Sequence, residues 1–149
     1  MQPFDLLREQ LGKTVPFAAH VGVDIVEVGE GTATARIADR AETKNHIGSQ
    51  HAGALFTVAE AASGAAMAGA LFPVLMQVRP VAAQSNVRFL KIAEGPILAE
   101  ARIEQKAPES LEELEAQGKV RFPVEVSLSN EAGHEVAAMS VDWHVSKGR

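Results

Sequence analysis

The chain has no cysteine and no tyrosine among its 149 residues, and it has a single tryptophan. Without cysteine it has no disulfide, no thiolate ligand for a metal ion and no cysteine nucleophile. The scarcity of aromatic side chains argues against stacking on bases, and a formal net charge of -5 disfavours nucleic-acid partners. The first residues lack a basic leader followed by an apolar stretch, so we expect no signal peptide and a cytoplasmic protein.

Charge is also nearly absent from one segment, residues 52–71, in which Glu60 is the only ionisable side chain. The segment is long enough to span a membrane, but it consists largely of alanine and glycine, which contribute little transfer free energy. We therefore predict no membrane partner and a central helix from Ala52 to Leu71, ended by Phe72-Pro73. Its small side chains allow other elements to pack closely around it.

Alternation of apolar and polar residues predicts six strands. They lie at Val21–Val28, Thr32–Ile37, Ala83–Ile92, Ile97–Lys106, Val120–Ser129 and Glu135–Val145, and a glycine turn joins the first two in a hairpin. A short amphipathic helix is predicted at Asp5–Leu11, a connector at residues 16–18, and a solvated helical turn or hairpin loop at the acidic residues 108–118. No linker divides the sequence, so residues 1–149 are predicted to form one α+β domain with a long central helix wrapped by a curved antiparallel sheet of about six strands.

A polar loop, Asn45 to Gly53, leads into the predicted central helix. The first backbone N–H groups of a helix lack intrahelical partners, and with the helix dipole they stabilise negative charge. Asn45 and His51 are candidates for orienting substrate or water. The alternative is that Asn45 is a plain turn residue and that His51 is a helix cap or a surface imidazole. A buried carboxylate without a partner is costly, so we expect Glu60 either to be paired or to line a cleft.

The stretch Asn45-x-x-Gly48-x-x-His51-Ala52-Gly53-Ala54-Leu55, with Glu60 fifteen residues after the asparagine, resembles the hotdog-fold acyl-CoA thioesterases. The similarity is to the phenylacetyl-CoA and 4-hydroxybenzoyl-CoA thioesterase-like groups, and it covers about residues 18–146. The resemblance implies a hotdog fold and hydrolysis of a CoA thioester to a free acid and CoA, with no cofactor beyond the CoA of the substrate. It also implies a homodimer or homotetramer in which each site combines the loop of one subunit with the carboxylate of another.

The resemblance assigns roles to individual residues. Glu60 would be the general base or nucleophile, Ala52 and Gly53 would offer amides to the thioester carbonyl, Asn45 would orient water, and His51 would support the loop. Candidate substrate contacts are Gln50, Thr57, Ser63, Arg88 and Lys91. On charge alone, and not from the resemblance, Arg88 and Lys91 are candidate phosphate contacts together with Lys106 and Lys119. Leu55, Phe56, Val58 and Met76 are predicted to line the acyl pocket.

The sequence departs from the pattern of that family in three places. Alanine replaces the first glycine of His-Gly-Gly, Ala82 or Ala83 stands where some relatives have a strand serine, and glutamate replaces the aspartate of many relatives. Two other functions fit the sequence: a 3-hydroxyacyl thioester dehydratase using His46 and Glu60, and an acyl-CoA-binding domain without catalysis. The spacing of His46 and His51 does not match a metal site.

Overall fold

The computed structural model describes residues 2–148 and contains one six-stranded antiparallel sheet together with four α-helices. The strands are β1 (Asp24–Gly29), β2 (Thr32–Ile37), β3 (Val78–Phe89), β4 (Ile97–Ile103), β5 (Lys119–Ser129) and β6 (Glu135–Lys147). The helices are α1 (Pro3–Thr14), α2 (Pro16–Val21), α3 (Ala52–Ala70) and α4 (Ala107–Gln117), with short 3-10 turns η1 (Ala41–Thr43) and η2 (Phe72–Gln77).

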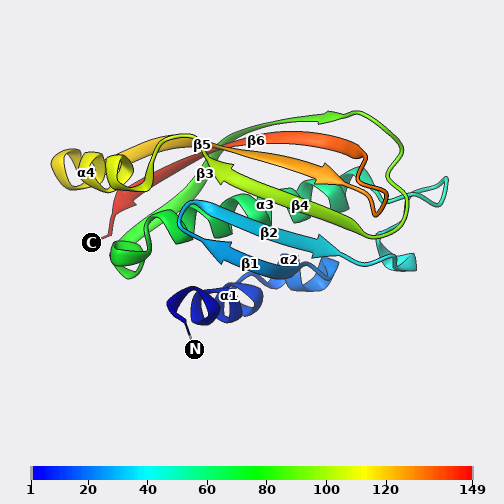
Figure 1. The fold of residues 1–149 in the computed structure, drawn as a ribbon, viewed down its shortest axis with the longest axis horizontal. Helices are drawn as coiled ribbons and strands as arrows, with labels where there is room; N and C mark the ends of the chain where they lie inside the picture. The colour runs from blue at the N-terminus through cyan, green and yellow to red at the C-terminus, as the bar shows by residue number, and fades with distance from the viewer. Residues whose placement is uncertain (1, 149) are drawn as a thin grey trace.

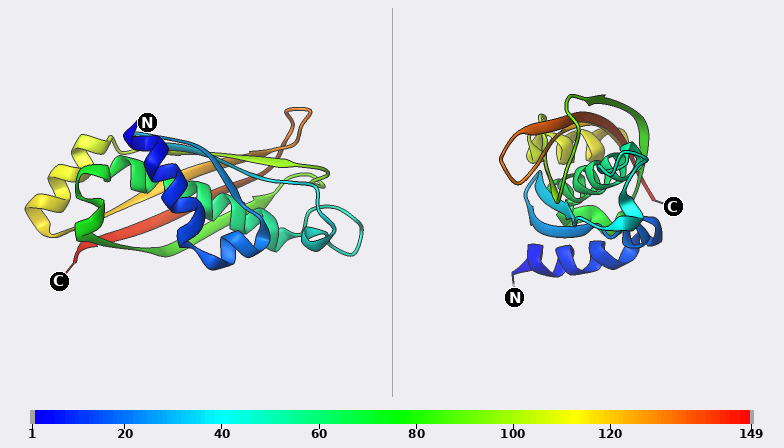
Figure 2. Two further views of the ribbon diagram at one scale, coloured as in Figure 1. Left: turned by 90° about the horizontal axis from the view of Figure 1, so that it is seen from below. Right: turned by 90° about the vertical axis from the view of Figure 1, so that its right-hand side faces the viewer.

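The strands follow the order β1-β2-β4-β5-β6-β3, so β1 and β3 form the two edges of the sheet. The sheet curves around α3, as the end-on view in Figure 2 shows, while α1 and α2 lie beside β1 (Figure 1). The predicted α+β architecture, with a long central helix wrapped by an antiparallel sheet, is confirmed. Among the described residues, no helix combines the length and the apolar character needed to cross a bilayer.

Small side chains on α3 explain how closely the sheet approaches it. Val58, Ala59, Ala62 and Ala66 are fully buried against the inward-facing side chains of the strands. Near the end of the helix, a Cβ at Gly69 would overlap the carbonyl oxygen of Gly29, so only glycine fits between α3 and β1. The alanine-rich composition therefore belongs to the core of the molecule.

The structure corrects several predicted boundaries at the N-terminal end. The first helix is longer than predicted because Pro3 occupies its first turn and the Asp5 carboxylate accepts a hydrogen bond from the Gln2 N–H. Residues 16–18, predicted as a connector, belong to α2, which ends at Gly22 with a φ of 90°. Strand β1 begins at Asp24 rather than Val21.

A β-bulge explains why simple alternation failed in β1. The register shifts between Ile25 and Glu27, so the intervening Val26 is an extra residue and is exposed. As a result Ile25 and Val28, three positions apart, both face the core. Strand β2 pairs with β4 without a register shift, and it has the predicted bounds.

Further differences lie after α3, where β3 ends at Phe89 and β4 ends at Ile103, each three residues before its predicted end. Strand β3 begins at Val78, five residues before the predicted start, and it includes Pro80, which a strand tolerates at the edge of a sheet. The acidic segment is a regular helix, α4, ended by Gly118 in the left-handed conformation, and its Ser110 and Leu114 are buried. Its acidic side chains face solvent as predicted, but the segment is a packed element rather than a turn or loop.

Candidate functional site

The entrance of α3 leaves one backbone amide without a protein partner. The Gly53 N–H donates to His51 Nδ1 at 2.8 Å, while the amides of Ala54 and Leu55 donate to the His51 carbonyl oxygen. Within residues 2–148, no acceptor lies within hydrogen-bonding distance of the Ala52 N–H, and Ala52 is exposed. His51 is therefore the N-cap of α3, and it leaves Ala52 as the amide that can receive an anion or a polarised carbonyl.

The loop before α3 is built around Asn45. Its Oδ1 accepts from the amides of Ile47 (3.1 Å) and Ser49 (3.0 Å), and its Nδ2 donates to Ser49 Oγ (2.8 Å). These bonds close a tight turn in which Gly48 has a φ of 79°. Because its side chain is engaged within the loop, Asn45 has the position of a loop organiser in this protomer, not of a group directed at substrate.

Gln50 is also structural, which corrects its predicted role as a substrate contact. Its side chain is 2% exposed and accepts from the hydroxyl of Thr43 at 2.8 Å. Its Nε2 donates to the carbonyl oxygens of Ala38 (3.0 Å) and Gly95 (2.9 Å), so both amide hydrogens are used. Gln50 thereby ties the loop to two neighbouring segments and has no polar group left for a ligand.

Glu60 lies on α3 two turns beyond the helix entrance, and its carboxylate has no partner among the described residues. No hydrogen bond or ion pair reaches it within residues 2–148, and no cation stands beside it. Partial burial raises the pKa of the Glu60 carboxyl above its ordinary value, because desolvation disfavours the charged form. Because a raised pKa makes the carboxylate a stronger base, Glu60 is suited to accept a proton from water.

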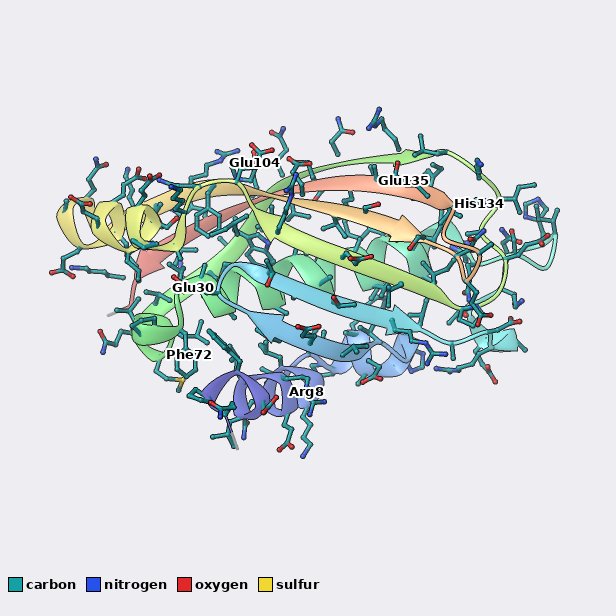
Figure 3. The ribbon with its side chains drawn as sticks, in the orientation of Figure 1. Arg8, Glu30, Phe72, Glu104, His134 and Glu135 are labelled. Atoms are coloured by element: carbon teal, nitrogen blue, oxygen red, sulfur yellow. The ribbon has the colours of Figure 1, made fainter. Side chains whose placement is uncertain are left out.

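Glu60 forms part of the wall of a cavity of about 990 Å³ between α3 and the two N-terminal helices. The other lining residues are almost all apolar and come from α1 and α2, one face of α3, the segment from η2 into β3, Val23 and Ile25 at the start of β1, and Trp143 of β6. Figure 3 shows Phe72 between α1 and the segment that follows α3, where its ring lies 5.6 Å from that of Phe4. Another hollow, on the solvent-facing side of the sheet, is lined only by strand residues and lies apart from α3.

Thr57, Glu60 and Ser63, which are spaced three residues apart on α3, do not form a single polar surface. Residues three apart on a helix differ by about 60° in direction, so Thr57 and Ser63 diverge to opposite sides of Glu60. The Thr57 hydroxyl donates to the Gly53 carbonyl oxygen at 2.7 Å, and the Ser63 hydroxyl donates to the Glu60 carbonyl oxygen at 2.7 Å. Both side chains are buried, so neither has the substrate contact predicted for it.

Ser63 instead fixes a wall of the cavity. Its hydroxyl accepts a hydrogen bond from Trp143 Nε1 at 3.0 Å, and this bond is buried. The indole of Trp143 lines the cavity, and its ring lies beside Gly64. This pair could not be predicted from the sequence, because the two residues are 80 positions apart.

Of the four residues predicted to line an acyl pocket, only Met76 does so. Leu55 and Val58 are buried in the core against the sheet, and Phe56 is partly exposed on α3 away from the cavity. The sequence analysis missed the contribution of α1. The spacing of Leu7 and Leu11 identifies its apolar face, but it does not indicate that this face encloses a cavity.

The predicted cationic contacts lie at two ends of the molecule. The backbone N–H of Gln50 donates to the Ala93 carbonyl oxygen at 2.7 Å, which brings the segment after β3, including Lys91, beside the polar loop. Arg88 is exposed near the same end of β3. Lys106 and Lys119 flank α4, at the end of the molecule opposite to the loop (Figures 1 and 2). His46 is exposed in the loop, and in residues 2–148 no group of three or more possible metal ligands occurs.

Ala52 and Glu60 of one chain are too far apart to act on one carbonyl group. Eight residues of α-helix separate them, which is a rise of about 12 Å. Both nevertheless lie along the side of α3 that keeps solvent exposure. We call the residues Gly53, Phe56, Glu60 and Gly64 the open face of α3, because they are spaced three or four apart and none is buried.

Comparison with solved structures defines the class of fold. The structure is similar to a protein of unknown function, PA5026, from Pseudomonas aeruginosa, described as a probable thioesterase, with 28% identity, a TM-score of 0.85, and coverage of 98% of this chain and 97% of that chain. It is similar to the PaaI protein from the phenylacetic acid degradation operon of E. coli, with 22% identity, a TM-score of 0.75, and coverage of 94% and 91%. A hypothetical thioesterase from Streptococcus pneumoniae, solved with coenzyme A, gives 18% identity, a TM-score of 0.64, and coverage of 86% and 88%.

These similarities, together with a long helix wrapped by an antiparallel sheet, show that the chain has the hotdog fold of the thioesterases. A family model described as a domain of unknown function, DUF4442, matches residues 5–145, and the chain belongs to this family. The comparison with curated proteins gives no match. The resemblance to hotdog-fold thioesterases that the sequence indicated is thus confirmed.

Proposed function

We propose that this protein is an acyl-CoA thioesterase that hydrolyses a CoA thioester to a free acid and CoA. The observation that carries the proposal is the Glu60 carboxylate, which has a raised pKa and no protein partner and which lies in the wall of a large apolar cavity. A carboxylate placed there costs stability, and a catalytic role explains why the site contains one. The similarity to solved structures described as thioesterases supports the same reaction class.

In the proposed reaction, Glu60 accepts a proton from water as the water oxygen attacks the thioester carbonyl carbon. The carbonyl oxygen becomes an oxyanion, which the free Ala52 N–H and the N-terminal end of α3 stabilise. When the tetrahedral intermediate collapses, the carbon–sulfur bond breaks and the proton passes from Glu60 to the departing thiolate of CoA. Direct attack by Glu60 would give an anhydride instead, and a single turnover in ¹⁸O-water would then place the label in the carboxylate of the enzyme.

The separation of Ala52 and Glu60 requires that two chains build each site. A twofold axis near Phe56 would make the open faces of two α3 helices antiparallel, and it would bring Ala52 of one chain beside Glu60 of the other, because both lie four residues from Phe56. The exposed edge of β3 supports a homodimer, since this long strand pairs only with β6 and presents Val81 to solvent. A dimer of dimers would repeat the same pair of sites.

The CoA moiety is proposed to extend from the helix entrance over the loop end of the molecule. Lys91 and Arg88 are exposed there and could pair with phosphate groups. Lys106 and Lys119 are too remote to take part in the same site. The likeness in fold to a hypothetical thioesterase solved with coenzyme A is in keeping with this ligand.

The proposal is tested by replacing Glu60 with glutamine and measuring thiol release from acyl-CoA substrates. We expect kcat to fall by two orders of magnitude or more, about the contribution of a general base, while the circular dichroism spectrum is retained. Glu30→Gln is the matched control, because Glu30 lies in the turn between β1 and β2, outside the cavity lining (Figure 3). Unchanged turnover in Glu60→Gln would remove Glu60 from the mechanism.

Two outcomes would support the other functions. Tight binding of acyl-CoA by the wild-type protein without thiol release would indicate a binding domain. Loss of water from a 3-hydroxyacyl thioester, abolished by His46→Ala, would indicate a dehydratase. His46 is exposed in the loop and does not line the cavity of its own chain, so a dehydratase site would have to combine it with Glu60 of a second chain.

A further inference from the structure

The cavity beside Glu60 is elongated along α3. Its lining includes Glu60, Gly64 and Ala68, which are spaced four residues apart and therefore lie along one side of the helix, and it continues to Phe72 beyond the helix end. The rise along α3 from residue 60 to residue 68 is about 12 Å, and the cavity continues past the helix end at Ala70 to Phe72 in η2. The space is thus an elongated cavity that opens to solvent beside exposed residues such as Leu6 and Met76, with the carboxylate at one end of its α3 wall, and we call it the channel.

The chemistry of the walls is uniform along this channel. Among the lining residues that the structure describes, Glu60 is the only ionisable one. Gln10 and Thr14 are the only other polar side chains among them apart from Trp143, whose N–H is already bonded to Ser63. The opposite wall is formed by aliphatic side chains of α1 and β1: Leu6, Leu7, Leu11 and Ile25. A wall without cations does not favour phosphate groups or a carboxylate at the far end of an acyl chain.

We propose that this channel holds a straight, uncharged fatty acyl chain, and that Gly64 and Ala68 determine how long a chain the enzyme accepts. The inference rests on the proposed function for the position of the thioester beside Glu60. It goes further by naming the substrate class: saturated fatty acyl-CoA thioesters of octanoyl length or longer, in preference to short, aromatic or dicarboxylic acyl groups.

Gly64 is the position where the channel is most easily closed. A Cβ at this residue would lie 3.3 Å and 3.6 Å from two ring carbons of Trp143, so any larger side chain must occupy the channel or displace the indole. Trp143 is held by its buried bond to Ser63, which resists that displacement. Ala68 lies one turn further from Glu60, so substitution there shortens the channel at greater depth.

The test measures kcat/KM for acetyl-, butyryl-, octanoyl-, lauroyl- and palmitoyl-CoA, with phenylacetyl- and succinyl-CoA as aromatic and charged comparisons. We expect a rise of about fourfold for each added methylene until the channel is filled, which corresponds to about 0.8 kcal/mol per CH2. Gly64→Leu should shift the preference towards short chains, and Ala68→Leu should shift it towards chains of intermediate length. Ala116→Leu, on the exposed side of α4, is the matched control and should leave the profile unchanged.

A second measurement separates this inference from the proposed function. Calorimetric binding of the same acyl-CoA series to Glu60→Gln reports on the channel without requiring hydrolysis. Because this measurement uses neither Gly64→Leu nor Ala68→Leu, it tests the channel even if one of those variants fails to fold. Hydrolysis without dependence on chain length would overturn the inference and leave the thioesterase proposal standing. Binding that tightens with chain length in a wild-type protein that releases no thiol would support the channel and refute the hydrolase. If the wild type releases no thiol and the affinity for acyl-CoA does not depend on chain length, both the thioesterase proposal and the channel are refuted.

Discussion

Replacement of Ala52 by proline removes one hydrogen-bond donor and leaves the helix that carries it intact. Ala52 is the first residue of α3, a position at which proline is favoured because its N–H has no intrahelical acceptor. The preceding residue, His51, has φ of −65° and ψ of 143°, which is the extended conformation that a following proline requires. Ala52 is also exposed, so the ring meets no packed neighbour in the protomer.

The loss of kcat expected for Ala52→Pro follows from the hydrogen bonds that the neighbouring amides make. Because the Gly53 N–H is bonded to His51 Nδ1, the Ala52 N–H is the first-turn donor left for an oxyanion. Loss of one such donor lowers kcat by about 10²- to 10³-fold, which is about 3 to 4 kcal/mol of transition-state stabilisation. Ala52→Gly keeps the N–H and restores the His-Gly-Gly pattern, so it should retain turnover.

The assay is thiol release followed with a thiol-reactive dye, and the protein itself gives no background because it contains no cysteine. We expect Ala52→Pro to melt within a few degrees of the wild type while losing turnover, and KM to change much less than kcat. Retained kcat in a folded Ala52→Pro protein would show that the amide does not stabilise the oxyanion. Equal losses in Ala52→Pro and Ala52→Gly would indicate a steric effect of position 52 instead.

Three further predictions follow from the same geometry. A Phe56→Cys protein should be joined into a covalent dimer by a short bismaleimide reagent. Met76→Cys is the control and should not be joined, because position 76 is also accessible but lies away from the proposed twofold axis. Absence of the cross-linked Phe56→Cys dimer would contradict that axis. Ser63→Ala should lower the free energy of unfolding by about 1 to 3 kcal/mol, because it leaves the buried Trp143 N–H without a partner, and the fluorescence of this single tryptophan should change as well. Glu60→Gln should melt at a higher temperature than the wild type at about pH 7 but not at about pH 4. The folded-state pKa of Glu60 is raised, so the folded protein binds the proton more tightly than the unfolded chain does. The wild type therefore loses stability as the pH rises from the ordinary pKa of glutamate through the raised pKa, and the glutamine variant does not. Equal melting temperatures at the higher pH would show that ionisation of this carboxylate does not cost stability.

The sequence identified the groups of the candidate site more reliably than their contacts. The isolated charge of Glu60 and the polar loop before α3 were evident from composition and spacing, because an unpaired carboxylate in an apolar helix is rare. His51 and Gln50 were noted in the same loop, but their roles depend on distances to Gly53, Ala38 and Gly95 that only the folded loop provides.

The elements that sequence alone misplaced share one property. Val26 is an extra residue in a bulge, Pro80 lies in an edge strand, and Leu114 is the buried residue of an otherwise acidic helix. In each case the strand or core that packs against the segment determines which secondary structure it adopts. Local propensity cannot report such partners, since they are distant along the chain.

The sequence by itself determined the long alanine-rich helix, the strand pattern around it and the lone carboxylate, because hydrophobic period and charge placement are properties of neighbouring residues. Tertiary structure alone decided that α1 encloses a cavity beside Glu60 and that Ser63 holds Trp143 in the wall of this cavity. Each of these depends on where segments far apart in the chain meet when apolar faces are buried together, and burial acts on the whole surface of the folded molecule rather than on any single stretch.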